Sequence, residues 1–125
     1  MEFNDQQAIY LQIADLLCEN ILLGKWKPED RIPSVREMAV SIEVNPNTVM
    51  RTYNYLQEKE IIFNKRGIGF FVADDGFKKT KLLRKNEFIK QELPKVFKEM
   101  KLLDLGMEDM KSYYENYLNE RDENK

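Results

Sequence analysis

The side chains best suited to chemistry lie close together between residues 45 and 51, where amide, hydroxyl and guanidinium groups follow one another. Asn45, Asn47 and Thr48 can hydrogen-bond base edges or backbone oxygens in a major groove. Arg51, one helical turn later, can reach a phosphate or a guanine, and no acidic residue lies among the four. The cluster is therefore suited to contact with DNA. Taken singly, Asn45 is also a typical helix cap, and an exposed arginine is typically a solvated surface charge.

Further basic residues flank this cluster in the sequence. Lys65 and Arg66 lie in a short loop between two apolar runs, where they suit a narrow minor groove. Gly67 beside them would let the backbone approach the duplex closely, although the needs of the turn alone explain this glycine equally well. Arg36, on the first turn of another predicted helix, points away from its apolar side and can contact the other side of the duplex.

The residue types that most enzymes need are missing. There is no histidine and only one cysteine, Cys18. Within one chain this excludes histidine acid–base catalysis, Ser–His–Asp and Cys–His triads, His/Cys zinc sites and a disulfide. Acidic pairs with D-x-D or E-x-x-H spacing and a glycine-rich phosphate loop are absent too. We therefore expect a protein that is not an enzyme, with no catalytic residue, metal or cofactor; a small carboxylate-based enzyme is the weakest alternative.

The net charge of -2 conceals an uneven distribution. Residues 1–75 carry 8 Lys and Arg against 12 Asp and Glu, whereas residues 76–125 carry 12 against 10. A front half that is acidic on average can bind DNA only through a local basic patch, which screening over about 10 Å at ordinary salt permits. The acidic start, the single cysteine and the lack of an 18-residue apolar run predict a cytoplasmic protein with no membrane segment.

Two helices before the cluster are predicted from their end signals. Asn4 can cap a helix whose apolar residues recur at three-to-four spacing up to Gly24, which accepts the left-handed conformation of a C-terminal cap. A loop rich in turn residues follows over 25–30. Ser34 and Glu37 then form an S-x-x-E capping box at the start of a second, short helix.

The cluster itself begins a third helix, because asparagine at the cap followed by Pro46 is a strong start signal. Its inward side is carried by Val49, Tyr53 and Leu56. The apolar runs 61–63 and 70–72 around the basic loop then predict a β-hairpin. Helix, helix, turn, helix and hairpin is the order of a winged helix-turn-helix. We therefore predict such a DNA-binding domain over residues 1–75 of a mainly α protein with a small β-hairpin.

Several motifs in register resemble the GntR family of bacterial transcription regulators. They cover about residues 8–73 and read AIYLQI (8–13), IPSVREMA (32–39), VNPNTV (44–49), RTYNYL (51–56) and RGIGFFV (66–72). Two positions depart from the family pattern, since Glu43 and Glu60 stand where glycine is usual. Both put the local backbone in question, because a left-handed residue is less comfortable without glycine.

The resemblance implies DNA binding as a homodimer at an operator with two-fold symmetry. Carried over onto the matching positions, the DNA-binding residues are Ser34, Arg36, Asn45, Asn47, Thr48, Arg51, Lys65, Arg66 and Gly67. We expect free backbone N–H groups at the Pro46 end of the third helix to favour phosphate. The predicted function is a sequence-specific DNA-binding transcription regulator, a repressor. A winged-helix module that binds protein through its acidic surface is the alternative.

The remaining residues, 76–125, are predicted to be helical and to pair. A basic run, with no acid between, is either a solvated helix face or a border of the DNA site: Lys78, Lys79, Lys81, Arg84 and Lys85. Apolar residues then recur at heptad-like spacing, at Leu82, Ile89, Leu93, Val96, Met100 and Leu103. Pro94 interrupts this seam and predicts either one kinked helix or two abutting helices. A final helix is marked by Met107, Met110, Tyr114, Tyr117 and Leu118, with a frayed end from Asn119.

This tail carries more apolar surface than one small winged domain can cover, so a second copy is the expected cover. The predicted dimerisation residues are Leu82, Ile89, Leu93, Val96, Met100, Leu103, Met110, Tyr114 and Tyr117. Packing against the chain's own first helix is the alternative. Within the family, so short a tail resembles the YtrA-type branch, whose two C-terminal helices dimerise. The tail is too short for the larger effector-binding domains of other branches, and an effector site in a cleft between subunits stays open.

Overall fold

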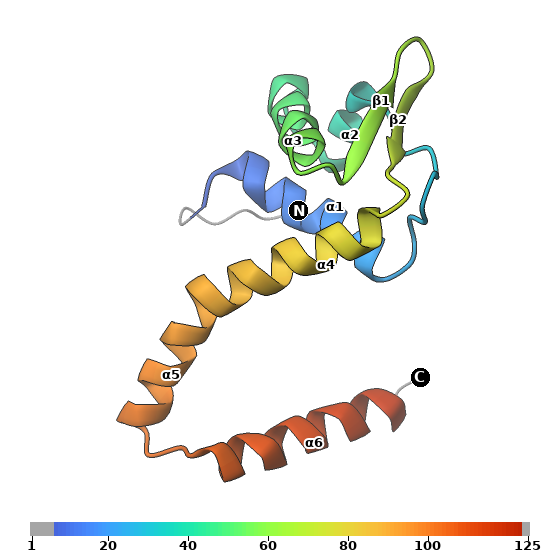
Figure 1. The fold of residues 1–125 in the computed structure, drawn as a ribbon. Coiled ribbons are helices and arrows are strands. Elements are labelled where there is room, and N and C mark those ends of the chain that lie inside the picture. Colours follow the sequence, from blue (N-terminus) through green and yellow to red (C-terminus); the bar gives the residue numbers. More distant parts are fainter. Residues whose placement is uncertain (1–6, 124–125) are drawn as a thin grey trace. The chain divides into compact units, whose positions relative to one another are not determined.

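The first helix, α1 (Ile9–Leu22), lies below the next two helices and the hairpin in the view of Figure 1 and buries one face in the core that they share. The computed structural model describes residues 7–123, so the predicted cap Asn4 lies outside the described residues, and Ala8 is the residue at the N-cap. The other end follows the prediction. Gly24 takes φ +78°, and the Lys25 N–H donates to the Asn20 carbonyl at 2.9 Å. A left-handed glycine thus closes the helix, as in a Schellman-type end.

The next two helices, α2 (Val35–Ile42) and α3 (Pro46–Glu58), begin where the sequence predicts. The Ser34 hydroxyl accepts from the Glu37 N–H, and the Glu37 carboxylate accepts from the Ser34 N–H, both at 3.1 Å. These bonds to Ser34 hold the pKa of Glu37 below its ordinary value. Between the helices Glu43 adopts φ +56°, a left-handed conformation that glycine would take with less strain.

The hairpin consists of β1 (Ile62–Lys65) and β2 (Gly69–Val72), paired antiparallel with Lys65 opposite Gly69. A third segment, missed by the sequence analysis, joins β2 along its free edge. The Ile32 N–H donates to the Phe70 carbonyl and the Val72 N–H to the Asp30 carbonyl, both at 2.9 Å. The loop predicted over 25–30 is confirmed, and the pairing with β2 begins at its last residue, Asp30. These bonds anchor the wing to the segment that leads into α2.

The core of this unit collects one face of each helix and the base of the hairpin. Tyr53 is fully buried at its centre, where its hydroxyl donates to the Pro33 carbonyl at 2.6 Å. Burial raises the pKa of Tyr53 well above its ordinary range. Each fully buried aliphatic side chain contributes about 1.5–3 kcal/mol of transfer free energy. The largest of them are Ile13, Leu17, Ile21, Val49, Leu56, Ile61, Ile62 and Val72.

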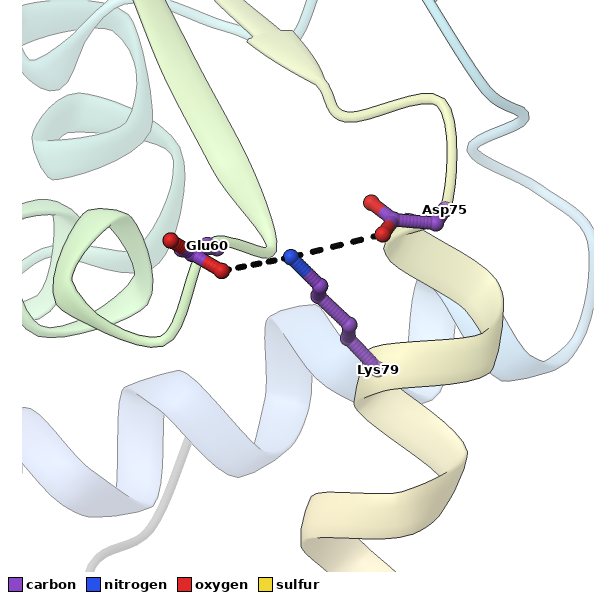
Figure 2. Close-up of polar contacts among 3 residues, drawn as sticks. All are labelled: Glu60, Asp75 and Lys79. Atoms are coloured by element: carbon purple, nitrogen blue, oxygen red, sulfur yellow. Dashed lines mark hydrogen bonds and ion pairs between the residues drawn. The ribbon is translucent and has the colours of Figure 1, made fainter.

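Helix α4 (Gly76–Glu87) begins directly after the wing, and its residues up to Arg84 belong to the same unit. Gly76 and Thr80 are buried and Leu83 packs against the core. Figure 2 shows Lys79 pointing from α4 toward Glu60, whose Oε2 lies 2.6 Å from the Lys79 Nζ, with the Asp75 carboxylate at 3.3 Å. The hydrogen bond to Glu60 raises the pKa of Lys79.

The end of this unit is tied back to α1. The Arg84 guanidinium donates to the Asp15 carbonyl at 3.1 Å and lies 3.6 Å from its carboxylate. Lys79 and Arg84 are therefore occupied within the chain, while Lys78, Lys81 and Lys85 of the basic run are exposed. The compact units divide between Arg84 and Lys85. The functional division at residue 75 stays a prediction.

The second unit begins at Lys85 and is helical almost throughout. A π-helical segment, η1 (Phe88–Glu92), runs into α5 (Leu93–Leu102) without a loop, and Pro94, which has no N–H to donate, is the second residue of α5. A turn with Asp104 at φ +55° leads to α6 (Met107–Glu123). The frayed end predicted from Asn119 is wrong as far as Glu123, because these residues continue α6.

Candidate nucleic-acid interface

The start of α3 is built by Asn45, which caps the helix with its own side chain. Its Oδ1 accepts from the Asn47 N–H at 2.8 Å, and its carbonyl accepts from the Thr48 N–H at 3.0 Å. Pro46 has no N–H to offer. The expectation of free backbone donors for phosphate is therefore wrong at these positions, because the cap already uses them. Any contact made from this end of α3 must come from side chains.

Three of the predicted side chains do lie together. Asn47, Thr48 and Arg51 share an open hollow of about 360 Å³ with the start of α1, at Ala8, Ile9 and Tyr10. Asn47 and Arg51 are exposed and Thr48 is half-buried. The hollow thus presents an amide, a hydroxyl and a guanidinium, which are the groups that hydrogen-bond base edges in a major groove.

Arg51 has a partner that the sequence analysis did not single out. Its guanidinium carbon lies 4.0 Å from the centroid of the Tyr10 ring, well inside the range of a cation–π contact. The two residues are 41 positions apart, so spacing gives no sign of the contact. The only sequence signal is the aromatic residue at the start of a helix whose opposite face is apolar.

The wing presents the second set of predicted residues. Gly67 has φ +80°, so the turn itself requires a glycine there. Arg66 is exposed, and the Lys65 ammonium lies 5.0 Å from the centroid of the Phe71 ring. Phe63 and Phe71 stack with centroids 5.7 Å apart, and the same ammonium lies 6.0 Å from the centroid of the Phe63 ring, so it is close to both rings. The wing therefore carries Lys65 at the end of β1, beside two aromatic rings, and Arg66 in the turn that follows.

Ser34 and Arg36, at the start of α2, differ in whether the side chain is already engaged within the chain. Ser34 is engaged in the capping box and is half-buried, whereas Arg36 is exposed. Among the side chains that the structure describes, no carboxylate lies within ion-pair distance of Arg36, Arg51, Lys65 or Arg66. The first 75 residues, although acidic on average, thus keep four exposed cations available for an anionic partner.

Within residues 7–121, no group of three or more acidic, histidine or cysteine side chains is placed to hold a metal ion. No helix in the described part of the chain has the length and apolar character needed to cross a membrane.

The predicted dimerisation residues divide into two sets within the structure. Leu93, Val96, Met100 and Met110 are half-buried, and the last three line an open hollow of about 280 Å³ between α5 and the start of α6. The others are exposed: Leu82, Ile89, Leu103, Tyr114 and Tyr117. Among the described side chains from Lys85 onward none is buried, so these helices have no core of their own.

Two curated proteins of Bacillus subtilis resemble the chain. The uncharacterised helix-turn-helix transcriptional regulator YhcF is 38% identical over 109 residues, which make up 87% of this chain and 88% of that protein. The transcriptional repressor YtrA is 41% identical over 85 residues, 68% of this chain and 65% of that protein.

A solved structure resembles the chain over nearly its full length. The crystal structure of a GntR-family regulator from Bacteroides thetaiotaomicron superposes with a TM-score of 0.74 at 47% identity, covering 91% of this chain and 99% of that one. It supports the winged-helix fold read from the sequence. The family model for bacterial regulatory proteins of the gntR family matches residues 9–72, which run from the start of α1 to the end of the wing. The chain belongs to the GntR family.

Proposed function

We propose that this chain is a sequence-specific DNA-binding transcription regulator that acts as a homodimeric repressor in the cytoplasm, without catalytic activity or a cofactor. The observation that carries the proposal is the hollow at the start of α3. There Asn47, Thr48 and Arg51 present donors and acceptors on a helix that belongs to a GntR-family winged unit. The name of the relative YtrA, a transcriptional repressor, supports repression over activation.

In this proposal α3 enters the major groove of the operator. A recognition helix reads bases with the residues of its first turns, and Asn47, Thr48 and Arg51 lie on those turns. Arg51 can form the bidentate pair with guanine O6 and N7 that is the commonest specific contact. Asn45 positions the helix end through its cap, and Ser34 and Arg36 lie at the start of α2, where backbone phosphates would pass.

The wing supplies contacts of another kind. Lys65, Arg66 and the glycine turn between the strands suit the minor groove, where width and negative potential are read in place of base edges. Phosphate and minor-groove contacts of this type add affinity, while the α3 side chains add base preference.

The tail, residues 76–125 in the predicted division, would join two copies. Its exposed and half-buried apolar side chains need a cover, and a two-fold dimer supplies the same surface from both chains. Two heads related by a dyad then meet half-sites about one helical turn of DNA, roughly 34 Å, or a multiple of it apart.

The deciding experiment selects duplexes from genomic fragments and titrates the enriched site with Arg51→Ala at fixed salt. We expect affinity to fall on the order of 10- to 100-fold, since one guanine contact contributes about 1–3 kcal/mol. Lys27→Ala serves as the control, because it removes one exposed charge from the same unit. Unchanged affinity of Arg51→Ala would remove that residue from the interface. Enrichment of no duplex would favour the protein-binding alternative.

A further inference from the structure

We propose that Tyr10 is a positioning residue for Arg51: its ring holds the guanidinium in place before DNA arrives and so sharpens base reading by α3. This inference rests on the proposed function, because it gives a role to a residue of α1 in the reading of an operator by α3.

The contact between Tyr10 and Arg51 is close, and it leaves the N–H donors of Arg51 available for hydrogen bonds to DNA. The guanidinium carbon lies 4.0 Å from the ring centroid, whereas cation–π pairs extend to about 6 Å. The attraction is between the cation and the face of the ring, so it takes up none of the five N–H donors. The fork that pairs with guanine O6 and N7 stays available while the side chain is held.

Tyr10 is itself fixed to α3 by contacts on both its backbone and its ring. The Thr52 hydroxyl, fully buried, donates to the Tyr10 carbonyl at 2.8 Å. The Tyr10 ring meets the Tyr55 ring edge to face, with centroids 6.1 Å apart. Thr52 and Tyr55 follow Arg51 within about one turn of α3, so the contacts that hold Tyr10 come from the same stretch of helix as the residue that it supports. An aromatic ring with two χ angles and two anchors is a rigid platform for a long side chain.

The position of the contact connects it to the reading of bases. Tyr10 and Arg51 line the same hollow as Asn47 and Thr48. A free arginine loses rotamer freedom when it meets a base, and this loss weakens binding. A side chain already held over a ring loses less. The gain appears only where the held direction matches the base to be read, so the ring favours one base pair over the others.

The test compares Tyr10→Leu with Tyr10→Phe in the full-length chain, on the selected operator and on operators with single base-pair changes. Phenylalanine keeps the ring and the Thr52 contact, which uses the backbone, so we expect its affinity to stay within about twofold of wild type. Leucine removes the ring. We expect it to weaken binding about 3- to 10-fold, and to flatten base preference at the same base pair at which Arg51→Ala flattens it.

Two further measurements separate positioning from other roles. In an Arg51→Ala background, Tyr10→Leu should cause no additional loss, since there is no guanidinium left to hold. Thermal unfolding of each variant checks the fold, and Tyr10→Met is the substitute if the leucine variant is unfolded.

Several outcomes would overturn the proposal. One is unchanged affinity of the leucine variant. A second is tighter binding, which would mean that the ring holds Arg51 away from DNA. A third is an equal loss with and without Arg51, which would mean that Tyr10 contacts DNA itself. Failure of the wild-type chain to select any duplex is recognised before a Tyr10 variant is measured. That result would overturn the proposed function and this inference with it.

Discussion

The two units of this chain follow opposite rules of burial. In the first, which ends at Arg84, three helices and a hairpin enclose a core in which Tyr53, Leu56 and Val49 have no exposed surface. In the second, which begins at Lys85, no described side chain is buried, and Leu102 and Leu103 are 67% and 63% exposed. Both units contain apolar residues at helical spacing. They differ in that the first unit packs its apolar faces against one another within one chain, whereas the second does not.

That difference shows where stability and assembly originate. The first unit has a buried core of its own, so its folding should not depend on protein concentration. The second leaves apolar side chains on η1, α5 and α6 that water would surround in a lone chain. Helices of this kind gain their stability from packing and not from propensity. The second unit is therefore expected to fold fully only when a second copy covers it.

The largest effect should come from placing charge on the seam, the heptad-like row of apolar residues that runs from Leu82 to Leu103. Ile89→Asp combined with Val96→Asp puts two carboxylates one heptad apart on apolar positions, and we expect monomers and at least about a 100-fold loss of operator affinity, because two linked heads bind far more tightly than one. Light scattering and a binding titration measure the two effects. Gln91→Asp with Lys98→Asp is the control, since both positions are exposed and have the same spacing. If the seam variant still forms a dimer, the apolar residues of the second unit are not what joins the two copies.

Within the first unit, a core truncation should cost more than the same truncation in the tail. Leu56→Ala empties a fully buried site and should lower the free energy of unfolding by about 2–5 kcal/mol. Leu103→Ala in the monomeric seam variant should change it by less than about 0.5 kcal/mol. Urea denaturation measures both. Equal losses would mean that the tail has a core of its own in the single chain.

A smaller effect is expected at the two left-handed glutamates. Glu43 and Glu60 have φ +56° and +60°, and glycine should relieve up to about 1 kcal/mol of strain at each. Glu60→Gly also loses the ion pair with Lys79, whereas no described side chain pairs with Glu43. Glu43→Gly should therefore stabilise the first unit more, by a margin that thermal unfolding can measure. A larger gain from Glu60→Gly would show that the Lys79 contact contributes nothing.

The smallest effect concerns pH. Because the bonds to Ser34 lower the pKa of Glu37 in the folded chain, its contribution is present above the unfolded value of 4.5 and is lost as the pH falls through the folded value. Glu37→Gln keeps a capping side chain without the charge, so its stability should approach that of wild type as the pH drops below about 4.5. Unfolding curves between pH 3 and 7 provide the measurement. A constant gap between the two proteins would contradict the assignment.

These comparisons also show what the sequence could predict. Helix starts set by neighbouring residues were predicted correctly, as with the Ser34–Glu37 box and the Asn45 cap, because the deciding bonds span two or three positions. The pairing of residues 30 and 32 with the wing was missed, since its partners lie about 40 positions away and the segment has no strand pattern.

The site divides in the same way. Asn47, Thr48 and Arg51 share a helix face by spacing alone, so their grouping was predictable. The Tyr10 ring beneath Arg51 depends on how α1 crosses α3, which no local pattern encodes. Lys79 was grouped with a basic run, yet it turns toward Glu60, because α4 packs one face on the winged unit (Figure 2).

The π-helical segment before Pro94 makes the tail sensitive to the number of residues in this stretch as well as to their types. An i→i+5 turn holds more residues than an i→i+4 turn, so η1 stores an extra residue without a loop. Deleting one residue there would restore ordinary winding and leave the side-chain directions of α5 almost unchanged relative to residues 85–87, because four α-helical residues turn about as far as five residues of the wider turn. Rewinding the same five residues as α-helix without a deletion would instead rotate α5 about its own axis by about 100°. The π-helical turn thus sets which apolar side chains of α5 share a face with residues 85–87, and inserting a further residue there would redirect the side chains that two copies present to each other.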